Sequence, residues 1–233
     1  LRLSSFLNSP ARKLTADQKQ LISLGRGLVR EDVAGVLMDE PLTVIDPDLK
    51  FRLRRNLKEI NEQYKTTLVY VTHDQNEAMT FADNIIVMDQ GEIVQVGLPK
   101  DLFEKPRTTF VGYFIGSPAM NLFNSEILSD NSIKFNNGTI KTKTDLSKIK
   151  DKNVKLGIRS EFIKIATDQK ENIVSVKVTR VEDFGNFKLI TGKAGDLEIK
   201  SKVEREIPIS TEELKLHLPA EKCCIYSNEM LVN

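Results

Sequence analysis

The sequence is poor in the features that mark secreted and membrane-spanning proteins. Among its 233 residues are only two cysteines, Cys223 and Cys224. Because they are adjacent, they neither bridge each other readily nor match a metal-binding spacing such as Cys-x-x-Cys. We interpret them as small apolar residues of a strand in a reducing compartment. No apolar run approaches the ~18 residues of a membrane-spanning helix, and the first residues show no signal-peptide pattern.

The sequence also lacks an excess of charge of either sign. Lysine and arginine number 34 against 33 acidic residues, a net charge of +1. This balance gives no electrostatic footprint for a nucleic acid or an anionic membrane surface, so we predict no nucleic-acid partner. Hydrophobic residues make up 40% and charged residues 29% of the chain. This composition is typical of a soluble globular protein of one large or two modest domains, and it excludes collagen, coiled coil and wholesale disorder.

What the first half does contain is an alternation of helical and strand patterns. Apolar residues recur at helical spacing over 14–30, and a short, uniformly apolar run over 33–38 predicts a strand buried on both faces. Asp46-Pro47-Asp48 is typical of a helix start, and the helix it begins leads to a second apolar strand over 67–71. Strand, helix and strand over this length indicate a parallel βαβ unit.

The residue pattern of the sequence changes near Pro118. Before it, residues 84–97 predict two strands around a Gln90-Gly91 turn, and residues 99–116 predict short helices. After it come short, alternating, β-branched segments that are separated by Asn, Gly and Asp turn signals. These segments favour a small β-barrel or sandwich. We therefore predict two domains, 1–118 and 119–233.

Three residues suited to phosphate chemistry follow the two apolar strands directly. Asp39 and Glu40 come after the first strand, and His73 comes just after the second. If the strands are parallel neighbours, these side chains meet at the carboxyl edge of one sheet, where open α/β sheets bind ligands. An acid pair there suits a Mg²⁺-nucleotide, because one carboxylate can hold the metal through water while the next polarises an attacking water. The alternative is that the three residues merely cap strand ends.

Several motifs of the first half, taken together, resemble those of the ATPase subunit of an ABC transporter. VLMDEP at 36–41 resembles its Walker B motif, TVID at 43–46 its D-loop and VTHDQ at 71–75 its H-loop, while LTADQ at 14–18 lies where the signature motif belongs. The stretches that follow are similar to the subfamily of sugar and glycerol-phosphate importers. LGIRSEFI at 156–163 resembles part of the β-rich regulatory domain of that subfamily. The fold class implied is α/β, a partial P-loop ATPase domain, followed by an all-β, OB-like regulatory barrel.

The resemblance implies a role for each motif residue. It implies ATP and Mg²⁺ as cofactors, Asp39 in the Mg²⁺ shell, Glu40 as the base for the hydrolytic water and His73 as a contact of the γ-phosphate. The residues implied in nucleotide binding, across the interface of an ATPase dimer, are Thr15, Gln18 and Asp46.

The sequence departs from the family in two ways. First, no Gly-x-x-x-x-Gly-Lys-[Ser/Thr] loop occurs, so the chain resembles only the part of the ATPase after that loop. We expect the chain alone to be inactive, and a βαβ unit cut from its sheet to expose apolar strand faces and to dimerise or swap elements. Second, Ala16 and Asp17 replace two signature glycines. Thr15 and Gln18 also match a capping box, so this segment either retains its nucleotide role or serves only to start a helix.

The resemblance implies an ATPase that energises uptake of a sugar, polyol or glycerol phosphate. Its partners would be a second ATPase subunit in a homo- or heterodimer, transmembrane permease subunits and, indirectly, a substrate-binding protein, at the cytoplasmic face of the cell membrane. One alternative is a non-catalytic regulatory subunit paired with an active ATPase, and another changes the cargo to a polyamine or metal ion. We expect Arg159 to contact the ATPase part or a neighbouring subunit, or to form a structural salt bridge.

Overall fold

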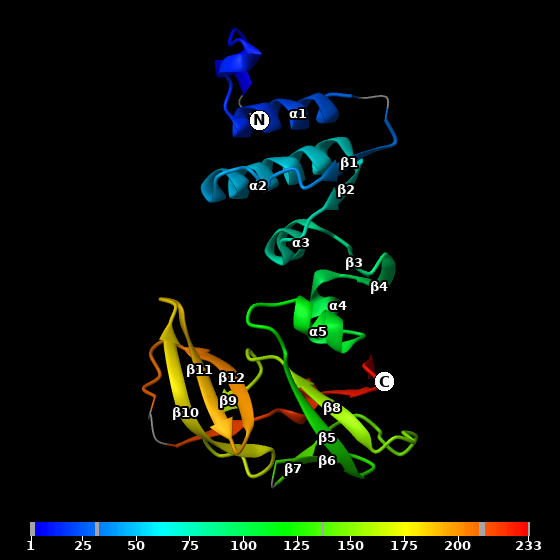
Figure 1. The fold of residues 1–233 in the computed structure, drawn as a ribbon, viewed down its shortest axis with the longest axis vertical. Helices are drawn as coiled ribbons and strands as arrows, with labels where there is room; N and C mark the ends of the chain where they lie inside the picture. The colour runs from blue at the N-terminus through cyan, green and yellow to red at the C-terminus, as the bar shows by residue number, and fades with distance from the viewer. Residues whose placement is uncertain (1–2, 31–32, 137, 210–212, 233) are drawn as a thin grey trace. The chain divides into compact units, whose positions relative to one another are not determined.

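The computed structural model describes residues 3–30, 33–136, 138–209 and 213–232 (Figure 1). The chain divides into two compact units, residues 1–83 and residues 84–233. The sequence-based boundary near residue 118 separates ATPase-like from β-rich sequence, which is a different division, and it stays a prediction. Among the described residues, no helix has both the length and the apolar character needed to cross a bilayer.

The first unit is built around a parallel strand pair. After two short 3-10 turns, Leu3–Phe6 and Ala11–Lys13, its elements in chain order are α1 (Ala16–Leu28), β1 (Gly35–Asp39), α2 (Pro47–Tyr64), β2 (Thr67–Val71) and α3 (Gln75–Phe81). β1 and β2 pair in parallel, with Gly35 opposite Thr67 and Asp39 opposite Val71. The predicted βαβ unit is therefore confirmed.

Helix α2 shows why this segment folds as the sequence indicates. Asp46 caps its first turn by accepting the Asp48 N–H at 3.0 Å, and Pro47 occupies the first helical position, where no N–H is needed. Lys65 ends the helix in the left-handed conformation, with φ of 52°. Leu53 and Leu57 point inward from one stripe. They join a core whose buried members are Leu21, Leu24, Met38, Leu42, Ile45, Leu53 and Leu57.

The two strands of the first unit are not buried on both faces. The side chain of Leu37 is 81% exposed, and Val69 and Val71 are exposed as well. The prediction of a doubly buried strand is therefore wrong for this chain, because the described helices α1 and α2 cover one face only. The expected exposure of apolar strand residues is seen in the structure, and the expected dimerisation or exchange of elements stays a prediction.

The second unit begins with a hairpin and two short helices. β3 (Ile85–Asp89) and β4 (Glu92–Gly97) pair antiparallel, followed by α4 (Pro99–Glu104) and α5 (Thr109–Phe114). Gln90 and Gly91 both have positive φ, 48° and 84°, as a tight two-residue hairpin turn requires. The two strands and the short helices predicted for 84–116 are thus confirmed.

The rest of the second unit consists of two antiparallel sheets. In spatial order the six-stranded sheet contains β15 (Met230–Leu231), β14 (Cys224–Ser227), β8 (Asn153–Ile158), β5 (Asn121–Ser129), β6 (Ser132–Phe135) and β7 (Gly138–Lys141). The five-stranded sheet contains β12 (Leu197–Glu204), β11 (Phe187–Ala194), β10 (Ile173–Asp183), β13 (Leu214–His217) and β9 (Lys164–Ile165). This strand-rich arrangement agrees with the β-rich texture of the sequence after residue 118.

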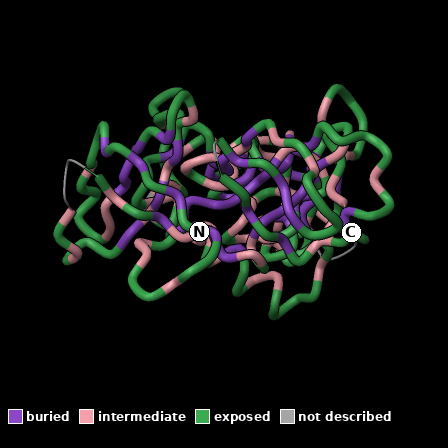
Figure 2. The backbone as a smooth tube through the Cα atoms, turned by 90° about the horizontal axis from the view of Figure 1, so that it is seen from below, coloured by how far each residue is buried: buried purple, intermediate pink, exposed green. Residues whose placement is uncertain are grey.

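A shared apolar core lies between these strands. In β10, buried and exposed residues alternate from Ile173 to Val178. Figure 2 shows buried, intermediate and exposed stretches interspersed along the backbone. Strands of both sheets supply the core, for example Leu156 from β8 and Ile199 from β12, each fully buried. Cys223 and Cys224 are both free and buried at β14, in agreement with their interpretation as small apolar residues.

Arg159 connects the β-rich part to helices α4 and α5. Its side chain is fully buried, and its Nε donates to the carbonyl of Phe103 at 2.9 Å. Its Nη1 donates to the carbonyls of Gly112, at 2.8 Å, and Ile115. These bonds confirm a contact with residues before 118. The sequence analysis also allowed a structural salt bridge for Arg159. The structure shows instead that its guanidinium bonds backbone carbonyls at the ends of two helices.

Candidate functional site

Glu40 occupies a strained position just after β1. Its φ of 46° lies in the left-handed region, which non-glycine residues seldom adopt. Its N–H donates to the carbonyl of Val71 at 3.0 Å, so the parallel ladder continues one residue beyond the strand. Asp39, the last residue of β1, is exposed beside it. Strain of this kind is often found where a side chain is held for a function.

Glu40 and His73 form a close pair at the ends of the two strands. The Glu40 Oε1 accepts the backbone N–H of His73 at 3.0 Å and lies 2.5 Å from its Nδ1. The hydroxyl of Thr43 donates to the Glu40 Oε2 at 2.9 Å. The side chain of His73 is 76% exposed and that of Glu40 35% exposed, so the pair is open to solvent. The structure thus brings Glu40 and His73 together at one sheet edge, while Asp39 precedes Glu40 at the end of β1 and its predicted part in the site stays a prediction.

The electrostatics of this pair shift both groups toward their charged forms. Hydrogen bonding to Glu40 raises the pKa of His73, and the negative charges of Glu40, Asp74 and Glu77 act in the same direction. The bonds from His73 and Thr43 lower the pKa of Glu40. Three donors thus hold the Glu40 carboxylate in its ionised form.

We expect the imidazole of His73 to titrate above 6.5, and the Glu40→Gln variant to lower its pKa toward that value. A raised pKa means that the pair stabilises the fold in full below pH 6.5 and loses this contribution as the pH rises through the pKa of folded His73. Glu40 has the opposite sign: its contribution is present above pH 4.5 and is lost as the pH falls through its lowered pKa. Proton NMR of the imidazole signals measures this directly.

The second histidine of the chain, His217, gives the internal control for this titration. It lies in β13 of the other unit, so its signal should not respond to Glu40→Gln. Equal titration of His73 in the parent chain and the variant would contradict the pairing.

The loop after Glu40 links the pair to both helices of the first unit. The amide of Gln20, in α1, donates to the carbonyl of Pro41 at 3.0 Å. Asp46 ends this loop as the cap of α2, with its carboxylate used by the Asp48 N–H. The structure therefore gives Asp46 a helix-capping role, and its predicted role in nucleotide binding stays a prediction.

Thr15 and Gln18 bind each other at the start of α1. The Thr15 Oγ1 accepts the N–H of Gln18, and the Gln18 Oε1 accepts the N–H of Thr15 at 3.1 Å, a complete capping box. The Thr15 hydroxyl donates to the carboxylate of Asp17, and this bond lowers the pKa of Asp17. In this conformation the hydroxyl proton is already used, which favours the helix-starting interpretation of the segment.

Glu77 does not make the contact that its spacing from Asp74 would indicate. Asp74 and Glu77 have the spacing of a capping box, and Asp74 does cap α3 through the N–H groups of Asn76 and Glu77. Glu77, however, does not reach back to Asp74. Its side chain is buried and bonds Tyr70 and Thr72 instead. The apolar neighbours Ala78 and Met79 gave no signal of this inward orientation.

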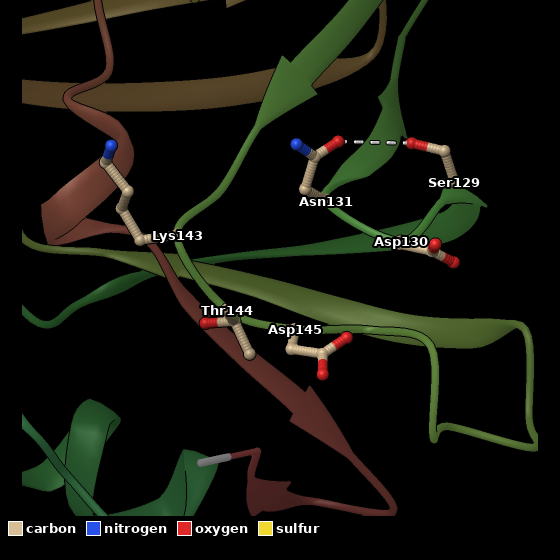
Figure 3. A pocket seen from close by; sticks show the side chains of 6 residues that line it. All are labelled: Ser129, Asp130, Asn131, Lys143, Thr144 and Asp145. Carbon is tan, nitrogen blue, oxygen red and sulfur yellow. Dashed lines mark hydrogen bonds between the residues drawn. The ribbon is translucent and has the colours of Figure 1, made fainter.

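A polar hollow lies on the surface of the second unit (Figure 3). Its lining residues are Ser129, Asp130, Asn131, Lys143, Thr144 and Asp145. Ser129 donates to Asn131 at 3.3 Å, and Asp145 accepts the N–H and the hydroxyl of Ser147. None of these lining side chains is buried. We therefore interpret the hollow as the space between two adjacent surface turns.

Comparison with known proteins gives a family match to part of the chain and many relatives that match nearly all of it. The family described as MalK OB fold domain matches residues 116–163. The sn-glycerol-3-phosphate import ATP-binding protein UgpC of Pectobacterium atrosepticum is 36% identical over 98% of this chain and 64% of its own length. The oligosaccharides import ATP-binding protein MsmX of Bacillus subtilis is 33% identical over 98% of this chain and 65% of its own length. The chain thus spans a little under two thirds of these relatives.

Proposed function

We propose that this chain supplies the hydrolytic half of an ABC importer ATPase together with its OB-fold regulatory domain. The proposal is supported by its 36% and 33% identity, over 98% of its length, to import ATP-binding proteins for glycerol phosphate and oligosaccharides. The observation that carries the proposal is the Glu40–His73 pair beside Asp39, at the carboxyl edge of two parallel strands. The domains proposed are 1–118 for the ATPase part and 119–233 for the regulatory part.

The residues of this edge fit a Mg²⁺-nucleotide in part. Mg²⁺ is usually held by one or two carboxylates, by water and by substrate phosphates, and the exposed carboxylate of Asp39 suits the first of these positions. Bound Mg²⁺ would neutralise phosphate charge there. The chain contains no phosphate-binding loop of the Gly-x-x-x-x-Gly-Lys-[Ser/Thr] kind, so other residues must hold the phosphates of ATP.

Within that assembly we assign a proton-accepting role to Glu40. A water beside its carboxylate would give up a proton as it attacks the terminal phosphate. Because the bond to His73 lowers the pKa of Glu40, this bond must loosen before the carboxylate can act as a base. The imidazole of His73 is exposed enough to turn from Glu40 to the phosphate. Exchange of one partner for the other would thus link nucleotide binding to activation of the base.

The wider setting is part of the same proposal. We assign the chain to the cytoplasmic face of the cell membrane, with permease subunits and a second ATPase subunit as direct partners and a substrate-binding protein as an indirect one. A sugar, polyol or glycerol phosphate is the proposed cargo, in keeping with the names of the relatives. A polyamine or metal ion is the alternative cargo.

A second candidate function is that of a non-catalytic subunit paired with an active ATPase. The observation that favours it is the capping box at Thr15 and Gln18, together with the negative charge of Asp17 at the position of a signature glycine. A carboxylate a few ångströms from nucleotide phosphates repels them.

Titration of Mg-ATP into two proteins tests the proposed function. One is the 233-residue chain, and the other is the same chain joined to a segment that carries a phosphate loop. We expect binding by the joined protein only, because the chain has no loop of its own. We also expect Asp39→Asn to weaken the Mg²⁺-dependent part of that binding.

The matched control is Asp48→Asn, which removes another exposed carboxylate of the first unit, in the first turn of α2. It should leave Mg-ATP binding unchanged. Absence of binding by both proteins would overturn the catalytic assignment and favour the regulatory one.

A further inference from the structure

A buried carboxylate lies directly behind the segment that carries His73. Glu77, in α3, is only 3% exposed. Burial of an ionised carboxylate is costly unless the charge is paired and hydrogen-bonded. The sequence offers an exposed helix position for this residue, since α3 is short and mostly polar, yet the side chain points inward. The buried carboxylate of Glu77 therefore requires hydrogen-bonding and charged partners.

Four side chains from two other elements satisfy this carboxylate. The hydroxyls of Tyr70 and Thr72 donate to its Oε2 at 2.8 and 3.1 Å. From α2, Lys50 lies 3.4 Å and Arg54 3.5 Å from its Oε1. Burial and the neighbouring Glu77 raise the pKa of Tyr70, so the phenol keeps the proton that it donates. Glu77 thus joins α2, the end of β2 and α3 at one point.

The same network fixes the backbone on both sides of His73. The Thr72 hydroxyl that donates to Glu77 also accepts the N–H of Asp74 at 3.0 Å. The carboxylate of Asp74 in turn caps α3 at the N–H of Glu77, 3.3 Å away. His73 therefore lies between two residues that are both tied to Glu77. From this position its N–H and its Nδ1 reach Glu40.

We propose that Glu77 is a positioning residue whose carboxylate holds the 72–74 segment through the Thr72 hydroxyl, which in turn accepts the Asp74 N–H, so that His73 is presented to Glu40. Glu77 acts on His73 through Thr72, and not by a direct bond to His73 or to Glu40. The catalytic meaning of this placement rests on the proposed function, whereas the placement itself does not. Loss of the Glu77 carboxylate should therefore release the imidazole of His73 even in the absence of nucleotide.

The test is the Nδ1 signal of His73 in the full chain, labelled with ¹⁵N-histidine. The chain has two histidines, so His217, in the other unit, is an internal reference. Glu40→Ala defines the signal of an unbonded imidazole. One amide oxygen cannot both accept from Tyr70 and Thr72 and pair with Lys50 and Arg54. We therefore expect Glu77→Gln to move the His73 signal toward this reference while the His217 signal stays in place. An unmoved His73 signal would overturn the proposal.

Matched variants separate positioning from general destabilisation. Glu59→Gln removes a carboxylate that pairs with Arg55 on the exposed side of α2, and it should not move the His73 signal. Thr72→Val removes only the hydroxyl that joins Glu77 to the segment, and it should reproduce the effect of Glu77→Gln. Thr72→Ser keeps the hydroxyl and should restore the parent signal.

The Thr72 pair keeps the proposal falsifiable if Glu77→Gln unfolds the first unit. Equal signals from Thr72→Val and Thr72→Ser would then overturn it. Because no step needs ATP, the result is independent of the proposed function. If the His73 signal moves in Glu77→Gln but no Mg-ATP binding is found, the positioning role of Glu77 stands and only its proposed part in catalysis fails.

Discussion

Replacement of Arg159 by methionine is expected to lower the free energy of unfolding of the second unit by about 3–5 kcal/mol. Methionine fills much of the same volume but donates no hydrogen bond. The carbonyls of Phe103, Gly112 and Ile115 would lose the guanidinium as a donor at once, and of these Gly112 would keep the Met120 N–H at 3.2 Å. Loss of a partner that leaves buried polar groups unsatisfied is among the most costly changes a single substitution can make.

The position of these carbonyls explains why a cation is needed there. They lie at the C-terminal ends of α4 and α5, where a helix leaves carbonyl groups without partners and carries a partial negative charge. The guanidinium also lies over the ring of Phe103, 4.5 Å from its centroid. Gly116 leaves room for it, since a Cβ at that residue would come within 2.9 Å of the Arg159 Nη1.

Urea unfolding followed by circular dichroism measures this effect. The matched control is Arg205→Ala, because Arg205 pairs with Asp183 at 3.2 Å on the exposed surface of the same unit. Exposed pairs of this kind contribute about 1 kcal/mol or less. A change in stability as small for Arg159→Met as for Arg205→Ala would show that the buried guanidinium is not what holds α4 and α5 to the β-rich part.

The second large effect is expected for Glu40→Gln in an assembly in which this chain takes part in ATP hydrolysis. The turnover should fall by about 10²- to 10⁴-fold, the range that a positioned general base contributes. Glutamine keeps the shape of the side chain and its ability to bond Thr43 and His73, but it does not accept a proton from water. Binding of Mg-ATP should therefore be retained, and steady-state turnover with direct nucleotide binding separates the two.

Glu62→Gln is the matched control for this experiment. It makes the same chemical change at an exposed residue of α2. Its turnover should equal that of the parent assembly. If Glu40→Gln also keeps the parent turnover, Glu40 is not the base, and the pair with His73 serves only to join the ends of β1 and β2.

Local sequence signals predicted most elements of the first unit because each element has its own start and stop chemistry. The Asp46-Pro47 start of α2 and the apolar run of β2 were both located correctly. The meeting of Glu40 and His73 was also predictable, because residues that follow adjacent parallel strands must reach the same edge of the sheet. The β-rich texture after residue 118 agrees with the OB-fold match at 116–163.

The contacts of particular polar side chains were not predictable in this way. Glu77 has the spacing of a helix cap, yet it bonds Tyr70 and Thr72 inside the unit. The partners of Arg159 are backbone carbonyls more than 40 residues away along the chain. A backbone carbonyl has no residue identity, so no pattern in the sequence marks it as the partner of a distant guanidinium.

The sequence by itself determined the order of helices and strands, the βαβ unit, the change to β-rich structure and the motif residues at the strand ends. These follow from periodicity, capping and spacing, which act over a few neighbouring residues. Only the tertiary structure decided which face of β1 and β2 is covered, that Glu40 is held by His73 and Thr43, and that Glu77 and Arg159 are buried. Burial and partner choice depend on residues far apart in the chain, because the cost of a buried charge is set by whatever the fold brings around it.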